Sequence, residues 1–128
     1  MIRLILSFPA ICLCLLLSAT SHGQTKSTAD GVYSKAQAEA GGLSYQASCG
    51  GCHDVKFYRD IWPYWQGKRL IDFYWRIVAE MPSDNPGSLS DDEYTKIVAY
   101  ILSELDYPIG ESSLNPLNDM DNITISAQ

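Results

Sequence analysis

Two cysteines and a histidine lie close together in the stretch Cys49-Gly50-Gly51-Cys52-His53. Two cysteines with two residues between them, followed at once by histidine, form the pattern of c-type haem attachment. In this chemistry the two thiols add across the two vinyl groups on one edge of a haem. The next residue is then held beneath the macrocycle, where its imidazole can bind the iron. The glycines between the cysteines carry no side chain that would obstruct a backbone pressed against the porphyrin. The motif predicts one covalently attached haem.

Three other interpretations compete for these residues. A disulfide-exchange motif has the same cysteine spacing, but it usually opens a helix in a fold that alternates strands and helices, and no such alternation is visible here. A zinc site needs about four ligands, whereas the motif supplies three and no second Cys/His pair follows. A structural disulfide would leave the position of His53 unexplained.

The N-terminus has the pattern of a secretory signal peptide. Residues 1–3 give a short positive start, Leu4–Leu17 is almost wholly apolar, and the small residues at 18–23 suit cleavage. The apolar run is too short to be a clear membrane span, although an uncleaved anchor remains an alternative. We therefore expect a signal peptide at residues 1–23 and a periplasmic or secreted mature protein.

Cleavage after Gly23 would remove Cys12, Cys14 and His22, which leaves the motif as the only source of cysteine. The rest of the chain is long enough for one small domain. The hydrophobic core of such a domain is only marginally stable, and a haem would complete it. The 128 residues carry a formal net charge of −6, and haem propionates would add to it. Nucleic acid and anionic membrane surfaces are therefore poor candidate partners.

Helical periodicity predicts an all-α domain with long loops. Ser34 can cap a first helix whose apolar positions are Ala36, Ala40, Leu43 and Ala47. In that helix the two consecutive glycines at 41–42 indicate either a break or a place where another helix approaches closely.

Between the motif and the next helix, residues 54–67 have no clean period and are rich in aromatic side chains. We interpret these as rings lining the haem: Phe57, Tyr58, Trp62, Tyr64 and Trp65. Proline at position 63 could leave a nearby carbonyl, that of Trp62 or Pro63, free to accept a bond from the second ring nitrogen of His53.

Two further helices follow. Apolar spacing predicts one over Leu70–Glu80, and Ser90 with Glu93 forms a capping box that opens another, ending before Pro108. The apolar positions of this last helix are Tyr94, Ile97, Val98, Ile101, Leu102 and Leu105. A polar tail follows, with scattered apolar anchors at Leu114, Leu117, Met120 and Ile123.

The iron position opposite His53 has three possible occupants: Met81, Met120 or nothing. Met81 ends a helix and precedes a proline that stiffens the loop, whereas Met120 lies in the tail and fits a packing role better. With histidine and methionine both bound, no position is free for substrate, and the methionine sulfur raises the reduction potential. That arrangement predicts an electron carrier rather than an enzyme.

The sequence resembles the class I cytochrome c family, especially small bacterial monohaem cytochromes such as the cytochrome domains of quinoprotein alcohol and sugar dehydrogenases. The similarity covers roughly residues 31–117. It is carried by residues 32–34 with 37–38, 49–53, Met81-Pro82, 86–90 and 99–102. In two respects the chain departs from the family: the span from His53 to Met81 is short, and Asp60-Ile61-Trp62 replaces the usual glycine-rich approach to the proline.

The resemblance implies a cytochrome c fold, with about three to four helices around one haem c. It implies thioether bonds at Cys49 and Cys52, with His53 and Met81 as axial ligands. Gly41 or Gly42 would be the small residue where the first helix crosses the last, with Tyr100 as its aromatic partner.

These observations favour a signal peptide at 1–23, a flexible lead at 24–31, a cytochrome domain at 32–110 and a tail at 111–128. The function expected is electron transfer between a periplasmic dehydrogenase, such as a quinoprotein, and an oxidase or another cytochrome, through brief encounters. One alternative is a haem enzyme or sensor with an open sixth site. Another is an obligate cytochrome subunit.

Overall fold

The computed structural model describes residues 25–116 and 119–128, so the expected signal peptide and Leu117 lie outside the described residues. Four α-helices carry most of the described chain: α1 (Lys35–Ser48), α2 (Phe57–Trp65), α3 (Leu70–Glu80) and α4 (Asp91–Glu104). Short elements flank them: strand β1 (Lys26–Ser27), 3₁₀ helix η1 (Thr28–Asp30), 3₁₀ helix η2 (Met120–Asn122) and strand β2 (Ile123–Thr124). The predicted all-α fold class is confirmed. Within the described ranges, no helix has the length and apolar character needed to cross a membrane.

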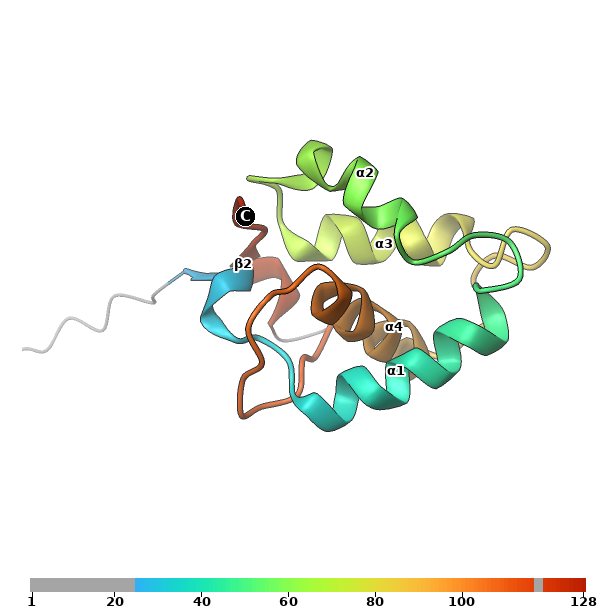
Figure 1. Ribbon diagram of the computed structural model, residues 1–128, viewed down its shortest axis with the longest axis horizontal. Helices are drawn as coiled ribbons and strands as arrows, with labels where there is room; N and C mark the ends of the chain where they lie inside the picture. The colour runs from blue at the N-terminus through green and yellow to red at the C-terminus, as the bar shows by residue number, and fades with distance from the viewer. Residues whose placement is uncertain (1–24, 117–118) are drawn as a thin grey trace, which may run out of the picture.

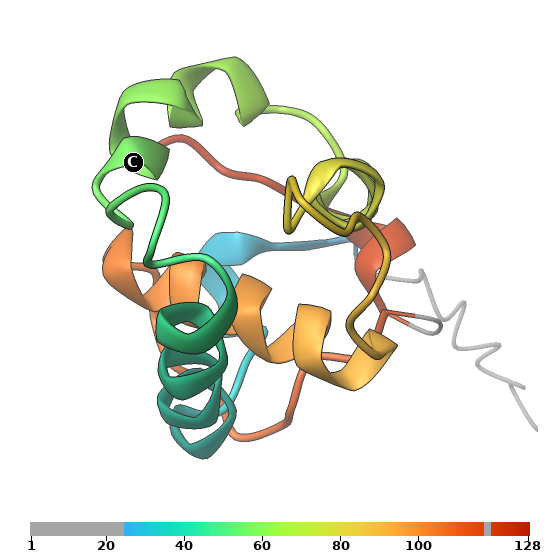
Figure 2. The same cartoon turned by 90° about the vertical axis from the view of Figure 1, so that its right-hand side faces the viewer.

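Helix α1 lies across α4, as Figures 1 and 2 show. Helix α2 contacts α3 through aromatic side chains, with the rings of Trp62 and Trp65 packed on that of Phe73. The α1–α4 crossing depends on a glycine. A Cβ added at Gly41 would lie 1.9 Å from the backbone oxygen of Lys96 and 3.0 Å from the Cβ of Tyr100. At Gly42 the added Cβ would lie 3.3 Å from the ring of Tyr100. The α1 helix is continuous, so the glycine pair marks a close approach and not a break.

The face that α1 buries differs from the predicted one. Its buried residues are Gln37, Ala38, Gly41 and Tyr45. The predicted apolar face is largely solvent-exposed, and Leu43 is 77% exposed. The prediction was wrong because close contact with α4 selects small residues and a polar group with partners rather than aliphatic ones.

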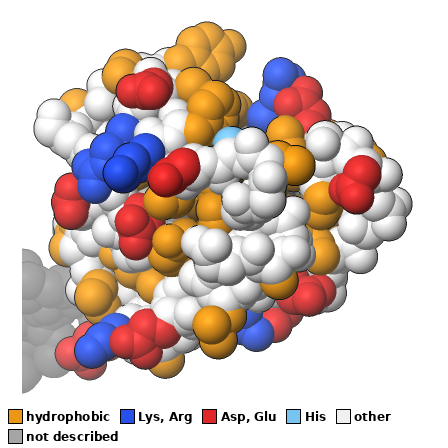
Figure 3. Space-filling view, turned by 45° about the vertical axis from the view of Figure 1, so that its right-hand side comes forward, with side chains coloured by type: hydrophobic (Ala, Val, Ile, Leu, Met, Phe, Trp, Pro, Cys, Tyr) orange, Lys and Arg blue, Asp and Glu red, His pale blue; other side chains and the backbone are white. Residues whose placement is uncertain are grey.

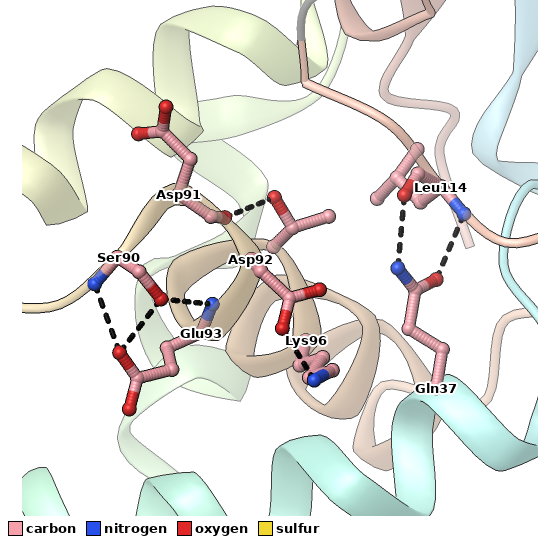
Figure 4. A network of polar contacts seen from close by, with 8 residues as sticks. Gln37, Ser90, Asp91, Asp92, Glu93, Lys96 and Leu114 are labelled. Atoms are coloured by element: carbon pink, nitrogen blue, oxygen red, sulfur yellow. Dashed lines mark hydrogen bonds and ion pairs between the residues drawn. The ribbon is translucent and has the colours of Figure 1, made fainter.

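Gln37 joins α1 to the C-terminal tail through a buried pair of hydrogen bonds (Figure 4). Its Nε2 donates to the backbone oxygen of Leu114 at 2.9 Å, and its Oε1 accepts from the backbone N–H of Leu114 at 2.8 Å. One side chain therefore satisfies both backbone groups of a buried tail residue, which is why a polar residue lies at this helix interface.

We expect Gln37→Leu to lower the free energy of unfolding by about 1–3 kcal/mol, because it leaves the two Leu114 backbone groups buried without partners. Chemical denaturation of the haem-loaded protein would measure this. Glu39→Ala, on the exposed side of the same helix, is the control and should change stability by no more than about 0.5 kcal/mol. Equal effects from the two variants would contradict the role given to Gln37.

The two helices with clear apolar periods form where they are predicted. Leu70–Glu80 is α3, with the bounds expected. The capping box that opens α4 is present: the Ser90 side chain accepts from the Glu93 N–H at 3.3 Å, and the Glu93 carboxylate accepts from the Ser90 N–H at 2.9 Å (Figure 4). All six apolar positions predicted for this helix are buried.

The two ends of the described chain pack together. β1 pairs in parallel with β2, and beyond β2 the backbone of Ile125 exchanges two 2.8 Å hydrogen bonds with Gly67 and Lys68. The segment 26–30 therefore contains a paired strand and a 3₁₀ helix, within the stretch 24–31 for which the sequence predicts a flexible lead. The predicted anchors Leu114, Met120 and Ile123 are buried. Ile125, which was not predicted, is buried as well.

Candidate haem site

The cysteine-histidine motif forms a tight turn directly after α1. The backbone N–H of Cys49 donates to the oxygen of Tyr45 at 2.7 Å, and the N–H of Cys52 donates to the oxygen of Cys49 at 3.1 Å. Cys49 is buried and Cys52 is exposed, and neither is in a disulfide. Burial raises the pKa of the Cys49 thiol, and the neighbouring Cys52 adds to that effect. Neither thiol is held in a disulfide, and both lie just after the C-terminal end of α1.

The His53 ring is surrounded by aromatic side chains. Its centroid lies 5.2 Å from that of Phe57, 5.9 Å from Tyr58 and 6.3 Å from Tyr45. Its Nδ1 lies 3.3 Å from the hydroxyl of Tyr45. Burial is the largest cause of the raised pKa of that hydroxyl, so it stays neutral at ordinary pH. The Tyr45 hydroxyl therefore occupies one ring nitrogen, which leaves Nε2 as the nitrogen for a metal.

A cavity of about 900 Å³ opens between α2 and α3 and includes both His53 and Met81 in its lining. Much of its wall is aromatic: Phe57, Tyr58, Tyr64, Trp65, Phe73 and Trp75. In Figure 3 hydrophobic side chains gather in the upper part of the molecule, around the pale blue histidine. The volume falls in the range of about 300–1,000 Å³ common for small-molecule and cofactor pockets.

Met81 is held at the end of α3 by two backbone hydrogen bonds. Its N–H donates to the oxygen of Ile77 at 2.8 Å, and its oxygen accepts from the hydroxyl of Tyr94 at 2.6 Å. Met81 is partly buried and lines the cavity. By contrast, Met120 is fully buried in the hydrophobic core and is not part of the cavity lining.

The chemistry of this donor set fits a haem. Two free thiols lie in the loop that carries His53, a thioether lines the same cavity, and aromatic rings cover the intervening wall. A haem c needs two thiols for its thioether bonds, a histidine for its iron and an apolar wall around its macrocycle, and these residues supply them.

A family model described as "Cytochrome C oxidase, cbb3-type, subunit III" matches residues 36–101, from α1 into α4. The chain belongs to this family of c-type cytochrome domains. The cytochrome carries covalently bound haem c, transfers electrons through it and exchanges them with redox partners. No curated protein and no solved structure matches the chain.

The cytochrome differs from the sequence prediction in the segment after the motif. Residues in the segment 54–67, for which the sequence showed no clean period, form α2, and four of the five predicted aromatic residues line the cavity. The exception is Trp62, which is buried against Phe73, with ring centroids 5.0 Å apart, and donates to the hydroxyl of Tyr107 at 2.8 Å. Helical spacing is nevertheless present in this segment of the sequence, at Tyr58, Ile61, Trp62 and Trp65.

The expected partner of the His53 ring was also wrong. The carbonyl of Trp62 or Pro63 was predicted to accept from it, but Pro63 lies inside α2 on the exposed side, and the hydroxyl of Tyr45 takes this place. Tyr45 lies four residues before Cys49, one helical turn away, which places it on the same side of α1 as the motif.

Charged side chains also line the cavity, and none of them was predicted from the sequence. The Lys68 Nζ lies 3.2 Å from the centroid of the Tyr64 ring, and Arg76 pairs with Glu80 at 2.8 Å. Cations over aromatic faces are attracted by the negative face of the ring. The cavity lining is therefore mainly apolar but also contains charged side chains.

Proposed function

We propose that this cytochrome is a monohaem electron carrier in which Cys49 and Cys52 hold the haem and His53 and Met81 bind its iron. The observation that carries the proposal is that one cavity is lined by both His53 and Met81, while Met120 lies apart from it in the core. Haem iron supplies the redox chemistry by taking up and releasing one electron. The chain's own residues hold the cofactor, keep water from it and fix its two ligands.

The aromatic side chains of the cavity differ in solvent exposure, and we assign different roles to the buried and the exposed ones. Tyr58 and Phe73 are buried and keep water from the wall. Phe57, Tyr64 and Trp75 are 46%, 70% and 51% exposed, respectively. We propose that these exposed rings contact redox partners in brief encounters, since small and weakly binding patches are usual in electron transfer.

The partners that we propose are an exported dehydrogenase, such as a quinoprotein, as donor, and an oxidase or another cytochrome as acceptor. The pattern of residues 1–23 supports a periplasmic location. The description of the family names an oxidase subunit, which favours a second candidate, a cytochrome held permanently in such an assembly. Gel filtration of the native protein from gently solubilised cells distinguishes a free carrier from a subunit.

Absorption spectra of the oxidised and reduced protein test the ligand set. We expect the weak long-wavelength iron–sulfur band in the ferric protein and no carbon monoxide binding to the ferrous protein at neutral pH. Absence of the band together with carbon monoxide binding would instead support a haem enzyme or sensor with an open sixth site.

We expect Met81→Ala to abolish this band, to lower the reduction potential and to let carbon monoxide bind the ferrous protein, because methionine sulfur favours the reduced iron. Potentiometry and carbon monoxide titration measure these effects. The control is Met120→Leu, a change of similar volume in the core, which should leave the potential unaltered. A lowered potential in the Met120 variant, with none in the Met81 variant, would assign the ligand to Met120.

A further inference from the structure

The hydroxyl of Tyr45 contacts His53 at two points. It lies 3.3 Å from the ring Nδ1 and donates to the backbone oxygen of His53 at 3.2 Å. We infer that Tyr45 is a positioning residue for the proximal ligand, His53. Its hydroxyl accepts a hydrogen bond from the His53 Nδ1–H and donates one to the His53 carbonyl. These two bonds set the orientation of the imidazole and its strength as a ligand. This inference rests on the proposed function, in which His53 binds the iron.

The backbone of Tyr45, like its side chain, is hydrogen-bonded to the loop that carries the cysteine-histidine motif. Its oxygen accepts from the N–H of Cys49 at 2.7 Å and from the N–H of Gly50 at 2.9 Å. Its side chain is 1% exposed, and its ring packs against that of Tyr100 on α4, with centroids 5.4 Å apart. The crossing of α1 and α4 therefore determines where the hydroxyl lies.

The hydrogen bonds are consistent in their directions. A neutral imidazole that binds a metal through Nε2 carries its proton on Nδ1, so Nδ1 must donate. A tyrosine hydroxyl has one proton and can also accept, so it can receive the Nδ1 proton and give its own to the carbonyl. One oxygen thus ties the imidazole ring of His53 to the backbone of the same residue.

This contact has a consequence for the iron. An acceptor at Nδ1–H makes a ligating imidazole more basic and holds its ring in one orientation. A more basic ligand stabilises the ferric state relative to the ferrous state. Without the Tyr45 hydroxyl, the reduction potential should rise and the Nδ1 proton should exchange faster with solvent.

The test uses Tyr45→Phe in the haem-loaded protein, which removes the hydroxyl and keeps the ring. We expect a shift of the potential to a higher value and faster solvent exchange of the His53 Nδ1–H, followed by NMR of nitrogen-15-labelled protein. The control is Tyr100→Phe, which removes a hydroxyl from the ring packed on Tyr45 but outside the cavity lining. Tyr100→Phe should change neither quantity, and equal shifts in both variants would overturn the inference.

A measurement on the wild-type protein keeps the inference separate from the proposed function. If the ferric protein shows no hyperfine-shifted His53 resonances, the proposed ligand set fails, and the inference falls with it. If those resonances are present but Tyr45→Phe leaves potential and exchange unchanged, the inference alone fails. Should Tyr45→Phe not fold, a nuclear Overhauser contact between the His53 Nδ1–H and the Tyr45 ring decides: its presence supports the inference and its absence overturns it.

Discussion

Replacing both Cys49 and Cys52 by alanine is expected to give a protein without covalently bound haem and without cooperative unfolding. The two thiols are the attachment points in the proposed site, and His53, which follows them in the chain, lines a cavity of about 900 Å³ whose wall is largely aromatic. A chain of this size has a small hydrophobic core that is only marginally stable by itself. The free energy of cofactor binding therefore supplies much of the free energy of folding. Loss of the haem should therefore remove most of the free energy of unfolding, which is about 5–15 kcal/mol for a typical native protein.

The double cysteine variant should be produced in a host that attaches haem covalently. Haem staining of a denaturing gel reports the covalent bond, and circular dichroism during heating reports cooperativity. Ser48→Ala changes the residue before the motif and keeps both thiols, so it should retain both properties. A double cysteine variant that melts cooperatively near the wild-type temperature would show that haem does not complete the core.

Replacing Gly41 by alanine should separate α1 from α4. The added Cβ would lie 1.9 Å from the backbone oxygen and 2.5 Å from the backbone carbon of Lys96, and backbone atoms cannot move aside as a flexible side chain can. Overpacking of this kind typically costs about 1–3 kcal/mol and occasionally more. The gain of up to about 1 kcal/mol in helix propensity offsets only part of that cost.

Gly42→Ala is the matched control on the same helix. There the Cβ would meet the ring of Tyr100 at 3.3 Å, and a ring can shift by a few tenths of an ångström. Denaturant unfolding of the haem-loaded variants should show a marked loss of stability for Gly41→Ala and little change for Gly42→Ala. Equal stabilities would mean that the two helices do not meet as closely as the structure shows.

Periodicity predicted two of the helices well because their buried faces are apolar. α3 has the predicted bounds, and the Ser90 capping box opens α4 as its local chemistry requires. In both cases the determining interactions are local: side-chain spacing on one helix and hydrogen bonds between residues three positions apart.

Periodicity failed for α1 and α2 for different reasons. In α1 the buried face contains Gln37 and Gly41, whose burial depends on Leu114 and Lys96, far away in the chain. In α2 the helical spacing was present, but the mixture of aromatic residues and Pro63 concealed it. The hydropathy pattern cannot identify the buried face of a helix when close backbone approach and hydrogen-bond partners, rather than apolar area, determine which face is buried.

The sequence by itself determined the chemistry of this protein: the cysteine-histidine motif predicts covalent haem, and the family match confirms that cofactor. It also narrowed the occupant of the iron position opposite His53 to Met81, Met120 or none. Only the tertiary structure placed Met81 in the cavity with His53, buried Met120 in the core and brought the Tyr45 hydroxyl to Nδ1. The reason is that spacing along the chain specifies local contacts. The position of Met81 in the same cavity as His53 depends instead on packing between different elements, which no single segment encodes.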